Sequence, residues 1–357
     1  MEKMKKAGNF SFEDLEEMLE YENSITRDKY VNSKELKMEG ITKMNGNGLD
    51  SLELSRGDNG GISVKLSDYA WSQLFGRMKM PIRYQKRLSE INPQLVAEQF
   101  NFLSDYYGKN LMLRFKAGNP EGEKHEEKDW YVRGVLSDSY TRIDNIDVFK
   151  LVGMAVNDKG LSDKVDLRSY ILNDKKFQAR VVFRDEHNTG RVDQTTGERD
   201  ILKFGLDIEN SEVGYSSIRI IPLVYRQVCS NGLRMWKRDE DMMLEQRHIH
   251  IGQDKLYDKV VATIANIFEG GKEMVEKLDK TAEIRIDNPY ETIDNIVEQE
   301  SLADKTKEKI VENYETYENG LNAYSIINAI TRTARDEKNE KRIELEEVAG
   351  KLLDDIA

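Results

Sequence analysis

The sequence predicts an α+β protein with a largely antiparallel sheet, N-terminal helices and a helical C-terminal subdomain. Two observations lead to this prediction. Apolar residues at helical spacing come first, short alternating segments follow one another between about residues 111 and 224, and helical spacing returns from Gln253 onward. Alternating segments in hairpin-like succession favour an antiparallel sheet over a parallel one.

The N-terminal region predicts helices after a loosely organised start, residues 1–60. Helical spacing appears at 12–22, while 45–61 is rich in Gly, Asn and Asp and predicts turns and loop. Ser67 and Asp68 offer N-cap oxygens for a helix that Pro81 ends. A second helix follows, and Pro93 opens a third one, because proline is favoured in a first helical turn.

The middle of the chain predicts six strands and one helix, at 145–156. The strands are expected at 111–115, 130–136, 165–172, 177–183, 201–208 and 217–224. The polar segment 186–200 predicts a loop. Pro222 argues against a continuous central strand, because proline has no N–H for the ladder. A bend at Pro222 would bring Arg226 and Arg234 toward one surface.

The C-terminal third predicts helices. Apolar residues at 256–267 form one helical face, and we expect Gly270 and Gly271 to end that helix. Residues 272–319 are highly charged with an amphipathic stripe, and helical patterns follow at 321–334 and 342–353. We therefore divide the chain into a loosely organised segment (1–60), an α+β core domain (61–252) and a helical subdomain (253–357).

Composition limits the partners and the compartment. Lys and Arg number 54 and Asp and Glu number 66, so the formal charge of −12 argues against coating duplex DNA by bulk charge. The one cysteine, Cys229, excludes an intrachain disulfide and a thiolate-rich zinc site. The N-terminus has no signal-peptide core and no apolar run could cross a bilayer. We expect a cytoplasmic protein of a bacterial host cell, without a membrane partner.

Two windows of the chain contain no acidic residue, although the whole chain is acidic. The window 69–89 contains Arg77, Lys79, Arg83, Lys86 and Arg87 with Trp71, Phe75 and Tyr84. The window 213–238 contains Arg219, Arg226, Arg234, Lys237 and Arg238 with Tyr215, Tyr225 and Trp236. Such windows favour a groove for a nucleic-acid backbone. The alternative is that the aromatic residues are core, as their helical spacing favours, and that the cations form an ordinary solvated face.

Motifs of enzymes and cofactors are missing. There is no Walker sequence and no G-x-S-x-G elbow. His248 and His250 would share one face of a strand, yet a zinc site needs more ligands. Cys229 follows an apolar run, so we expect it to be a small buried side chain and not a nucleophile. The polar turn 137–145, with Asn145 as a plausible helix cap, is the best remaining candidate for chemistry. We predict no cofactor, no metal and no catalytic residue.

Several of these stretches resemble the DUF932 family, which is related to phage and plasmid proteins and has no established activity. They are 66–88, RGVLSDSYTRIDNIDVF at 133–149, 209–233, RHIHIG at 247–252 and 320–335. The resemblance covers most of residues 60–335 and implies a prophage, phage or plasmid setting. Members are similar to phage single-strand annealing recombinases only in their hairpins, the helix that follows and the mobile-element context, which is an analogy of fold.

The main functional hypothesis is therefore a single-stranded DNA-binding or annealing protein that needs no ATP and acts in recombination or replication. We expect a homo-oligomer. The predicted contact residues are Arg83, Arg133, Tyr140, Arg142, Arg219, Arg226, Arg234, Trp236, Lys237 and Arg247. Within this set, Tyr140 and Trp236 would stack on bases, and the cations would hold phosphates.

Two other functions compete with this one. The acidic charge and the charged C-terminal region favour a factor that binds a host or phage protein, such as an inhibitor of host defence or an assembly factor, without nucleic-acid or catalytic activity. An enzyme would use Asp138 and Arg142 with His248 or His250, although no orienting partner for either histidine is evident.

Overall fold

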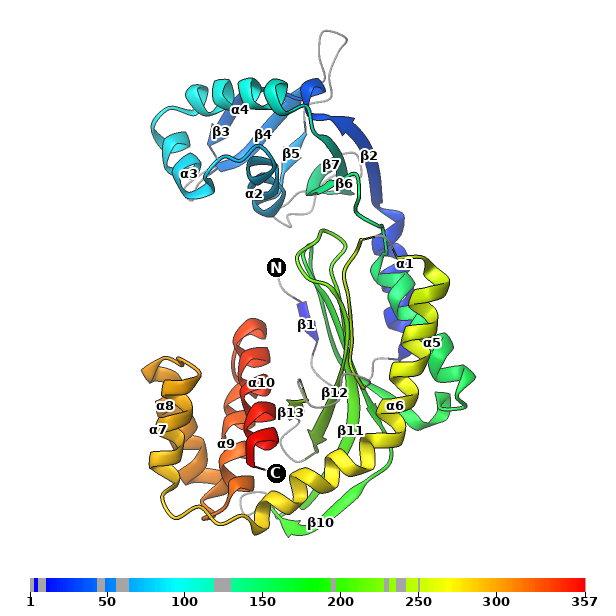
Figure 1. Cartoon of the computed structure of the whole chain (residues 1–357), viewed down its shortest axis with the longest axis vertical. Coiled ribbons are helices and arrows are strands. Elements are labelled where there is room, and N and C mark those ends of the chain that lie inside the picture. Colours follow the sequence, from blue (N-terminus) through cyan, green and yellow to red (C-terminus); the bar gives the residue numbers. More distant parts are fainter. Residues whose placement is uncertain are drawn as a thin grey trace.

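A computed structural model describes residues 3–5, 11–43, 49–55, 64–118, 130–193, 197–227, 231–235, 242–249 and 251–356. These residues form two main sheets, one above the other along the long axis, with helices around them (Figure 1). The predicted α+β class with largely antiparallel pairing is confirmed.

The larger sheet has eight strands, all paired antiparallel. Its order is β1-β8-β9-β11-β12-β13, and in addition β10 pairs with β11 and β14 pairs with β12. Its strands are β1 (Lys3–Lys5), β8 (Val165–Leu172), β9 (Phe177–Phe183), β10 (His187–Val192), β11 (Arg199–Asn210), β12 (Ile218–Arg226), β13 (Asn231–Arg234) and β14 (Leu244–Gln246).

The smaller sheet belongs to the N-terminal part of the chain. Its order is β2 (Thr26–Asn32), β6 (Asn110–Ala117), β7 (Trp130–Ser137) and β5 (Lys65–Leu66). A hairpin of β3 (Lys37–Lys43) and β4 (Leu49–Ser55) lies beside it, and three helices cover this sheet and hairpin: α2 (Asp68–Arg77), α3 (Ile82–Ile91) and α4 (Pro93–Tyr107). Trp71, Phe75 and Phe100 are buried together here, so these aromatic side chains are core.

The remaining helices surround the larger sheet. They are α1 (Phe12–Ser24), α5 (Asn145–Asp158), α6 (Gln253–Lys280), α7 (Pro289–Gln299), α8 (Asp304–Asn313), α9 (Ala323–Arg335) and α10 (Asn339–Ile356). A π-helical turn at Tyr314–Glu318 follows α8. None of the described helices is both long and apolar enough to cross a membrane.

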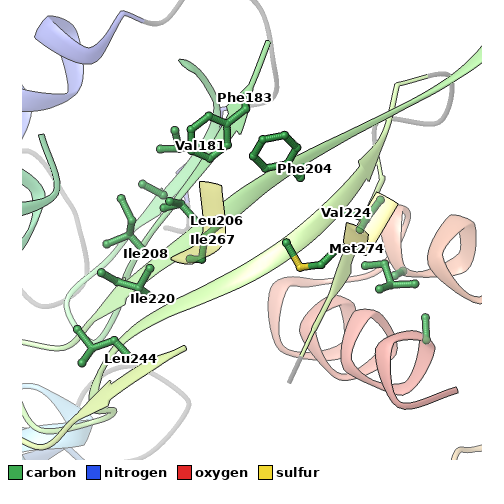
Figure 2. Packing of buried hydrophobic residues seen from close by; sticks show 14 of the residues in the cluster. Val181, Phe183, Phe204, Leu206, Ile208, Ile220, Val224, Leu244, Ile267 and Met274 are labelled. Atoms are coloured by element: carbon green, nitrogen blue, oxygen red, sulfur yellow. The ribbon is translucent and has the colours of Figure 1, made fainter. Parts of the chain in front are cut away.

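One face of the larger sheet is apolar. Alternate residues of β9, β11 and β12, including Val181, Leu206 and Ile220, are buried against α5 and α6 (Figure 2). Because every second side chain of a strand points to the same face, the alternation in sequence directly predicts this face.

The opposite face of the sheet is charged and also buried. Arg180 on β9 binds Asp207 on β11 and Glu346 on α10. These three side chains are at most 3% exposed. The alternation in β11 is typical of a strand with one solvated face, but α10 covers that face here. Paired charges satisfy one another there, as buried charges must.

Helix α6 continues through Gly270 and Gly271, so the predicted helix end is wrong. Gly271 lies against the ring of Phe204, and a Cβ at this position would overlap the ring. The glycine therefore permits a close helix–sheet approach. A helix of 28 residues tolerates it because packing, more than intrinsic propensity, stabilises helices in proteins.

Pro222 lies within a continuous strand, contrary to the prediction of a bend. It is opposite Leu206 of β11, and its carbonyl accepts a hydrogen bond from the N–H of Met235 at 2.9 Å. On that same side of β12, β14 pairs with residues 218–220 and β13 with 223–226. Pro222, which has no N–H to donate, therefore lies between the residues that pair with β14 and those that pair with β13.

Three smaller differences concern two predicted loops and one helix cap. Strand β4 lies within 45–61 and β10 within 186–200, both predicted as loops; each pairs with a neighbour that supplies hydrogen bonds regardless of a polar sequence. The N-cap of α5 is Asp144 and not Asn145, and its N–H is bound by the carboxylate of Asp147 at 2.9 Å.

Candidate functional site

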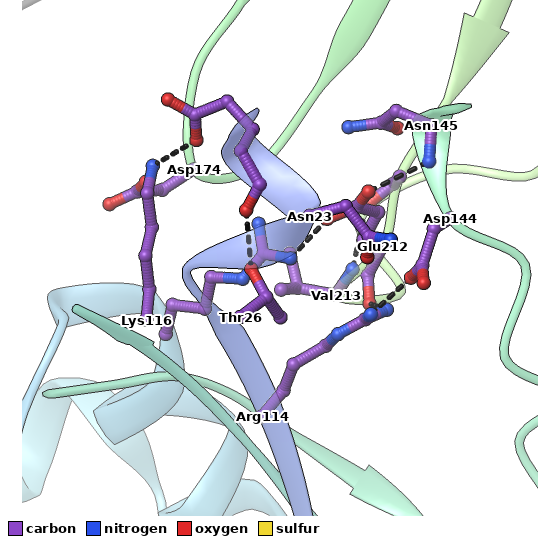
Figure 3. A network of polar contacts seen from close by, with 12 residues as sticks. Asn23, Thr26, Arg114, Lys116, Asp144, Asn145, Asp174, Glu212 and Val213 are labelled. Carbon is purple, nitrogen blue, oxygen red and sulfur yellow. Dashed lines mark hydrogen bonds and ion pairs between the residues drawn. The ribbon is translucent and has the colours of Figure 1, made fainter. Parts of the chain in front are cut away.

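A buried ion-pair network joins the two sheets. The Arg114 side chain, on β6, is fully buried, pairs with the carboxylate of Asp144 and donates to the Glu212 carbonyl at 3.0 Å (Figure 3). Its Nε lies 3.2 Å from Asp28 on β2. Removing one member of such a network leaves an uncompensated buried charge, so we expect its substitution to destabilise this junction strongly.

Glu212 is the centre of the junction on the side of the larger sheet. One carboxylate oxygen accepts a hydrogen bond from the Asn145 N–H at 2.7 Å, at the start of α5, and the other pairs with Arg133. Arg133 is 4% exposed. This predicted phosphate ligand is therefore bound inside the protein.

A cleft with a volume of about 410 Å³ lies beside this junction. Its walls come from α2, the end of β7, the connection between β11 and β12, and the segment after β14. The lining residues are Gln73, Arg77, Leu136, Ser137, Tyr140, Gly214, Tyr215, Ser216, Ser217, Arg247, His248 and Ile249. The cleft therefore unites parts of both acid-free windows with the Arg-His segment.

Gln73 fixes one wall of the cleft. Its Nε2 donates to the Val213 carbonyl at 2.8 Å, and its Oε1 accepts from the Val135 N–H at 2.8 Å. Gly214 follows with a φ of 71°, a backbone conformation that favours glycine. A Cβ there would lie 2.9 Å from a methyl group of Leu136, so glycine also allows the loop to approach β7.

The cleft has cations and, among the described residues, no carboxylate in its lining. Arg77 is partly buried and Arg247 is exposed. Within the described part of the chain, neither guanidinium forms an ion pair. Two uncompensated cations in a concave surface raise the local concentration of anions, even on an acidic protein.

The floor of the cleft contains a stacked aromatic pair. The rings of Tyr140 and His248 lie 4.9 Å apart at an interplanar angle of 8°. The Tyr140 hydroxyl donates to the Ser211 carbonyl at 2.8 Å, and the Thr141 N–H donates to the His248 carbonyl at 2.9 Å. These bonds hold the segment after β14 against the polar turn that precedes α5.

His248 is buried, and neither of its ring nitrogens has a hydrogen-bond partner among the described residues. Burial lowers the pKa of His248 to about 4, so the imidazole is neutral at pH 7. An unsatisfied buried polar group of this kind costs about 1–3 kcal/mol.

The other predicted arginines on the larger sheet pair with carboxylates. Arg226 pairs with Asp200 at 2.8 Å and with Glu318 at 2.6 Å. Arg234 has a fully buried side chain and pairs with Glu209 at 2.7 Å. Both guanidinium groups are buried in ion pairs, so neither can contact a phosphate in the folded protein.

Arg219 and Arg142 are nearer the surface but are also neutralised. Arg219 lies 3.3 Å from Glu245. Arg142 lies 2.6 Å from Asp144, with half of its side chain exposed. Arg83 is exposed on α3, outside the cleft lining. Trp236, Lys237, Cys229 and His250 lie outside the described residues.

The structure thus brings together Tyr140 and Arg247 of the predicted contact residues. It adds Arg77, Gln73 and Ser216, which sequence reasoning did not select as contact residues, although all three lie in the acid-free windows. The useful signal was the absence of acidic residues from two distant windows. In the described part of the chain, no group of three or more His, Cys, Asp or Glu residues could hold a metal ion.

Comparison with known proteins adds a family and no activity. Residues 132–351 match the family model described as Domain of unknown function (DUF932). This match includes most of the larger sheet, the junction residues Asp144 and Glu212, and the C-terminal helices. No curated protein and no solved structure matches the chain.

Proposed function

The chain belongs to the DUF932 family, and we propose from the geometry of the junction cleft that it binds single-stranded DNA there. Binding would need no ATP and would serve strand annealing in the recombination or replication of a mobile element. Arg77 and Arg247 would contact phosphates, and the apolar surface beside Tyr140 and His248 would pack against a base or sugar.

The observation that carries this proposal is the meeting of the two acid-free windows and the Arg-His segment in one cleft. The guanidinium groups of Arg77 and Arg247 come from segments far apart in the sequence, and among the described residues no carboxylate lines the space between them. Phosphate contacts from such groups supply most of the affinity of a sequence-independent binder. The cleft volume of about 410 Å³ lies within the range of small-ligand sites, about 300–1,000 Å³.

The test is fluorescence anisotropy with a labelled oligonucleotide at several salt concentrations. Arg77→Gln/Arg247→Gln removes both cations of the cleft, so affinity should fall about tenfold or more. For single strands each neutralised phosphate contributes about 0.7 to the salt slope, so the double variant should have a slope smaller by about 1.4. Arg184→Gln, at an exposed ion pair with Asp166, is the matched control and should change neither quantity.

Two outcomes would contradict the proposal. If the wild-type protein binds no oligonucleotide at micromolar concentration and low salt, the DNA-binding function is wrong, and a protein partner becomes the better hypothesis. If the wild type binds but the double variant keeps its affinity and its salt slope, the binding site lies elsewhere.

A further inference from the structure

The outer face of α3 and α4 exposes large apolar side chains. Phe102 and Tyr106 on α4 are 69% and 73% exposed, and their rings stack 6.4 Å apart. Leu95 is seven residues before Phe102 and therefore lies on the same side of the helix. Tyr84 and Ile91 are exposed on α3 in the same way. Exposed apolar side chains gathered on adjacent elements mark interaction surfaces.

This face is also basic. Arg83, Lys86 and Arg87 are exposed on α3, and within the described residues none of them forms an ion pair. Three exposed carboxylates lie on these helices: Asp105, which is paired with Lys37 at 2.8 Å, and also Glu90 and Glu98. Residues 64–118 contain nine Lys and Arg against four Asp and Glu, in a chain whose total charge is negative. We call this surface the basic face.

The C-terminal helices carry the opposite charge. Asp304, Glu308 and Glu312 follow one another at four-residue spacing on α8, all exposed, and in the described part of the chain no cation pairs with them. Residues 287–318 contain ten Asp and Glu against three lysines. Tyr290, exposed at the start of α7, adds an aromatic ring. We call this surface the acidic face.

The acidic stripe is unfavourable in an isolated chain. Like charges four residues apart on a helix repel by about 0.2–0.5 kcal/mol per pair. Lys307 and Lys309 are paired with Asp294 and Glu337, so, of the described residues, Lys305 is the one local lysine left to relieve the repulsion among three carboxylates. Cations from outside the chain would offset it.

One copy of the chain cannot join its own two faces. Figure 1 shows α3 and α4 at one end of the long axis, with α7 and α8 toward the other. We propose that the basic face of one copy docks on the acidic face of a second copy. Phe102 and Tyr106 would be the apolar contacts, and Arg83, Lys86 and Arg87 would lie against the stripe on α8. This inference does not depend on the proposed DNA binding.

The two faces differ, so the contact is heterologous. A chain of such contacts keeps one free basic face at one end and one free acidic face at the other, so growth ends only when a ring closes. Complementary charge accelerates association and makes it sensitive to salt. The assembly should therefore be largest at low salt.

The experiment measures molar mass by light scattering after gel filtration, on the full chain. Arg83→Gln/Arg87→Gln neutralises the basic face and Glu308→Gln/Glu312→Gln neutralises the acidic face without creating new complementary charges, so each variant alone should be a monomer. An equimolar mixture of the two should give dimers only, because each contributes the one intact face that the other lacks. The wild type should exceed the dimer at low salt and dissociate at high salt.

Controls separate assembly from folding and from DNA binding. Lys255→Glu/Lys272→Glu changes two exposed lysines of α6 and should assemble like the wild type. Circular dichroism should show that every variant is folded. A monomeric wild type at low salt would overturn the proposal, as would a mixture of the two variants that stays monomeric. So would a variant of the basic face that assembles normally while losing oligonucleotide affinity, since that face would then belong to DNA.

Discussion

Arg234 and Arg247 have the same side chain and opposite environments. Arg234 is fully buried between Asp207 and Glu209 of β11, whereas Arg247 is exposed at the cleft, where no carboxylate of the described residues lies in the lining. Arg234 lies in an acid-free window, whereas Arg247 follows Glu245 by two residues, so local composition favoured the arginine that turned out to be buried. The carboxylates that neutralise Arg234 come from β11 and from α10, and only folding brings them close.

His248 should make the fold sensitive to acid. Because burial lowers its pKa from 6.5 to about 4, the unfolded chain binds a proton in this interval that the folded chain does not. The free energy of unfolding therefore falls as the pH drops from about 6.5 to about 4, by on the order of 3 kcal/mol from this residue.

His248→Gln removes this titration but keeps a polar side chain. The wild type should lose more stability than the variant between neutral pH and about pH 4, and urea unfolding at several pH values measures the difference. Parallel stability curves for the two proteins would show that the imidazole is solvated or bound in the folded state.

At the scale of elements, glycine has different effects at two helical positions. Gly271 in α6 faces the Phe204 ring, whereas a Cβ at Gly76 in α2 would have nothing within 4 Å. The helical sequence pattern does not distinguish these positions, because the obstruction comes from a strand distant in sequence. Each prediction about a helix end made from glycine alone therefore needs the packing around it.

Alanine substitutions should reveal this difference. Gly76→Ala should raise the free energy of unfolding by about 0.4–1 kcal/mol through the unfolded chain's lower entropy. Gly271→Ala should lower it by about 1–3 kcal/mol, since overlap with the ring outweighs the gain in helix propensity. Chemical denaturation of both variants checks the signs, and a stabilising effect at both positions would mean that α6 can move away from the sheet.

At the scale of the whole molecule, buried charge ties the C-terminal helices to the sheet. Arg180 contacts Asp207 on β11 and Glu346 on α10, and the neighbouring arginines hold the pKa of Asp207 down to about 2. A similar network around Arg114 ties the smaller sheet to the larger one. Both networks join parts of the chain that are far apart in sequence, so we expect the parts to unfold together.

Arg180→Met tests this coupling. The substitution leaves Asp207 and Glu346 without their shared cation, and it should lower the free energy of unfolding by roughly 3–5 kcal/mol. Arg184→Met, at an exposed ion pair directly after β9, should change it by less than about 0.5 kcal/mol. Thermal unfolding followed by circular dichroism compares the two, and equal effects would show that the buried network is not essential for stability.

The sequence by itself determined six of the strands, β6 to β9, β11 and β12, and most of the helices, because local periodicity follows from the geometry of each element. The bounds 165–172 and 177–183 agree with β8 and β9 to the residue, and the family likeness came from motifs within the same stretches. It also located the two acid-free windows that meet in the cleft. The sequence did not predict the continuous strand through Pro222 or the helix through Gly271, because each depends on contacts with a strand that is distant in sequence.

Only the tertiary structure decided which charged side chains face water. The alternating polar residues of β11 look solvated until α10 covers them, and then Asp207 and Glu209 become internal partners for Arg180 and Arg234. A charge near carboxylates on a covered face is neutralised, and a charge at an open edge stays free to bind an anion. That distinction depends on distances between elements remote in sequence, which composition and periodicity do not specify.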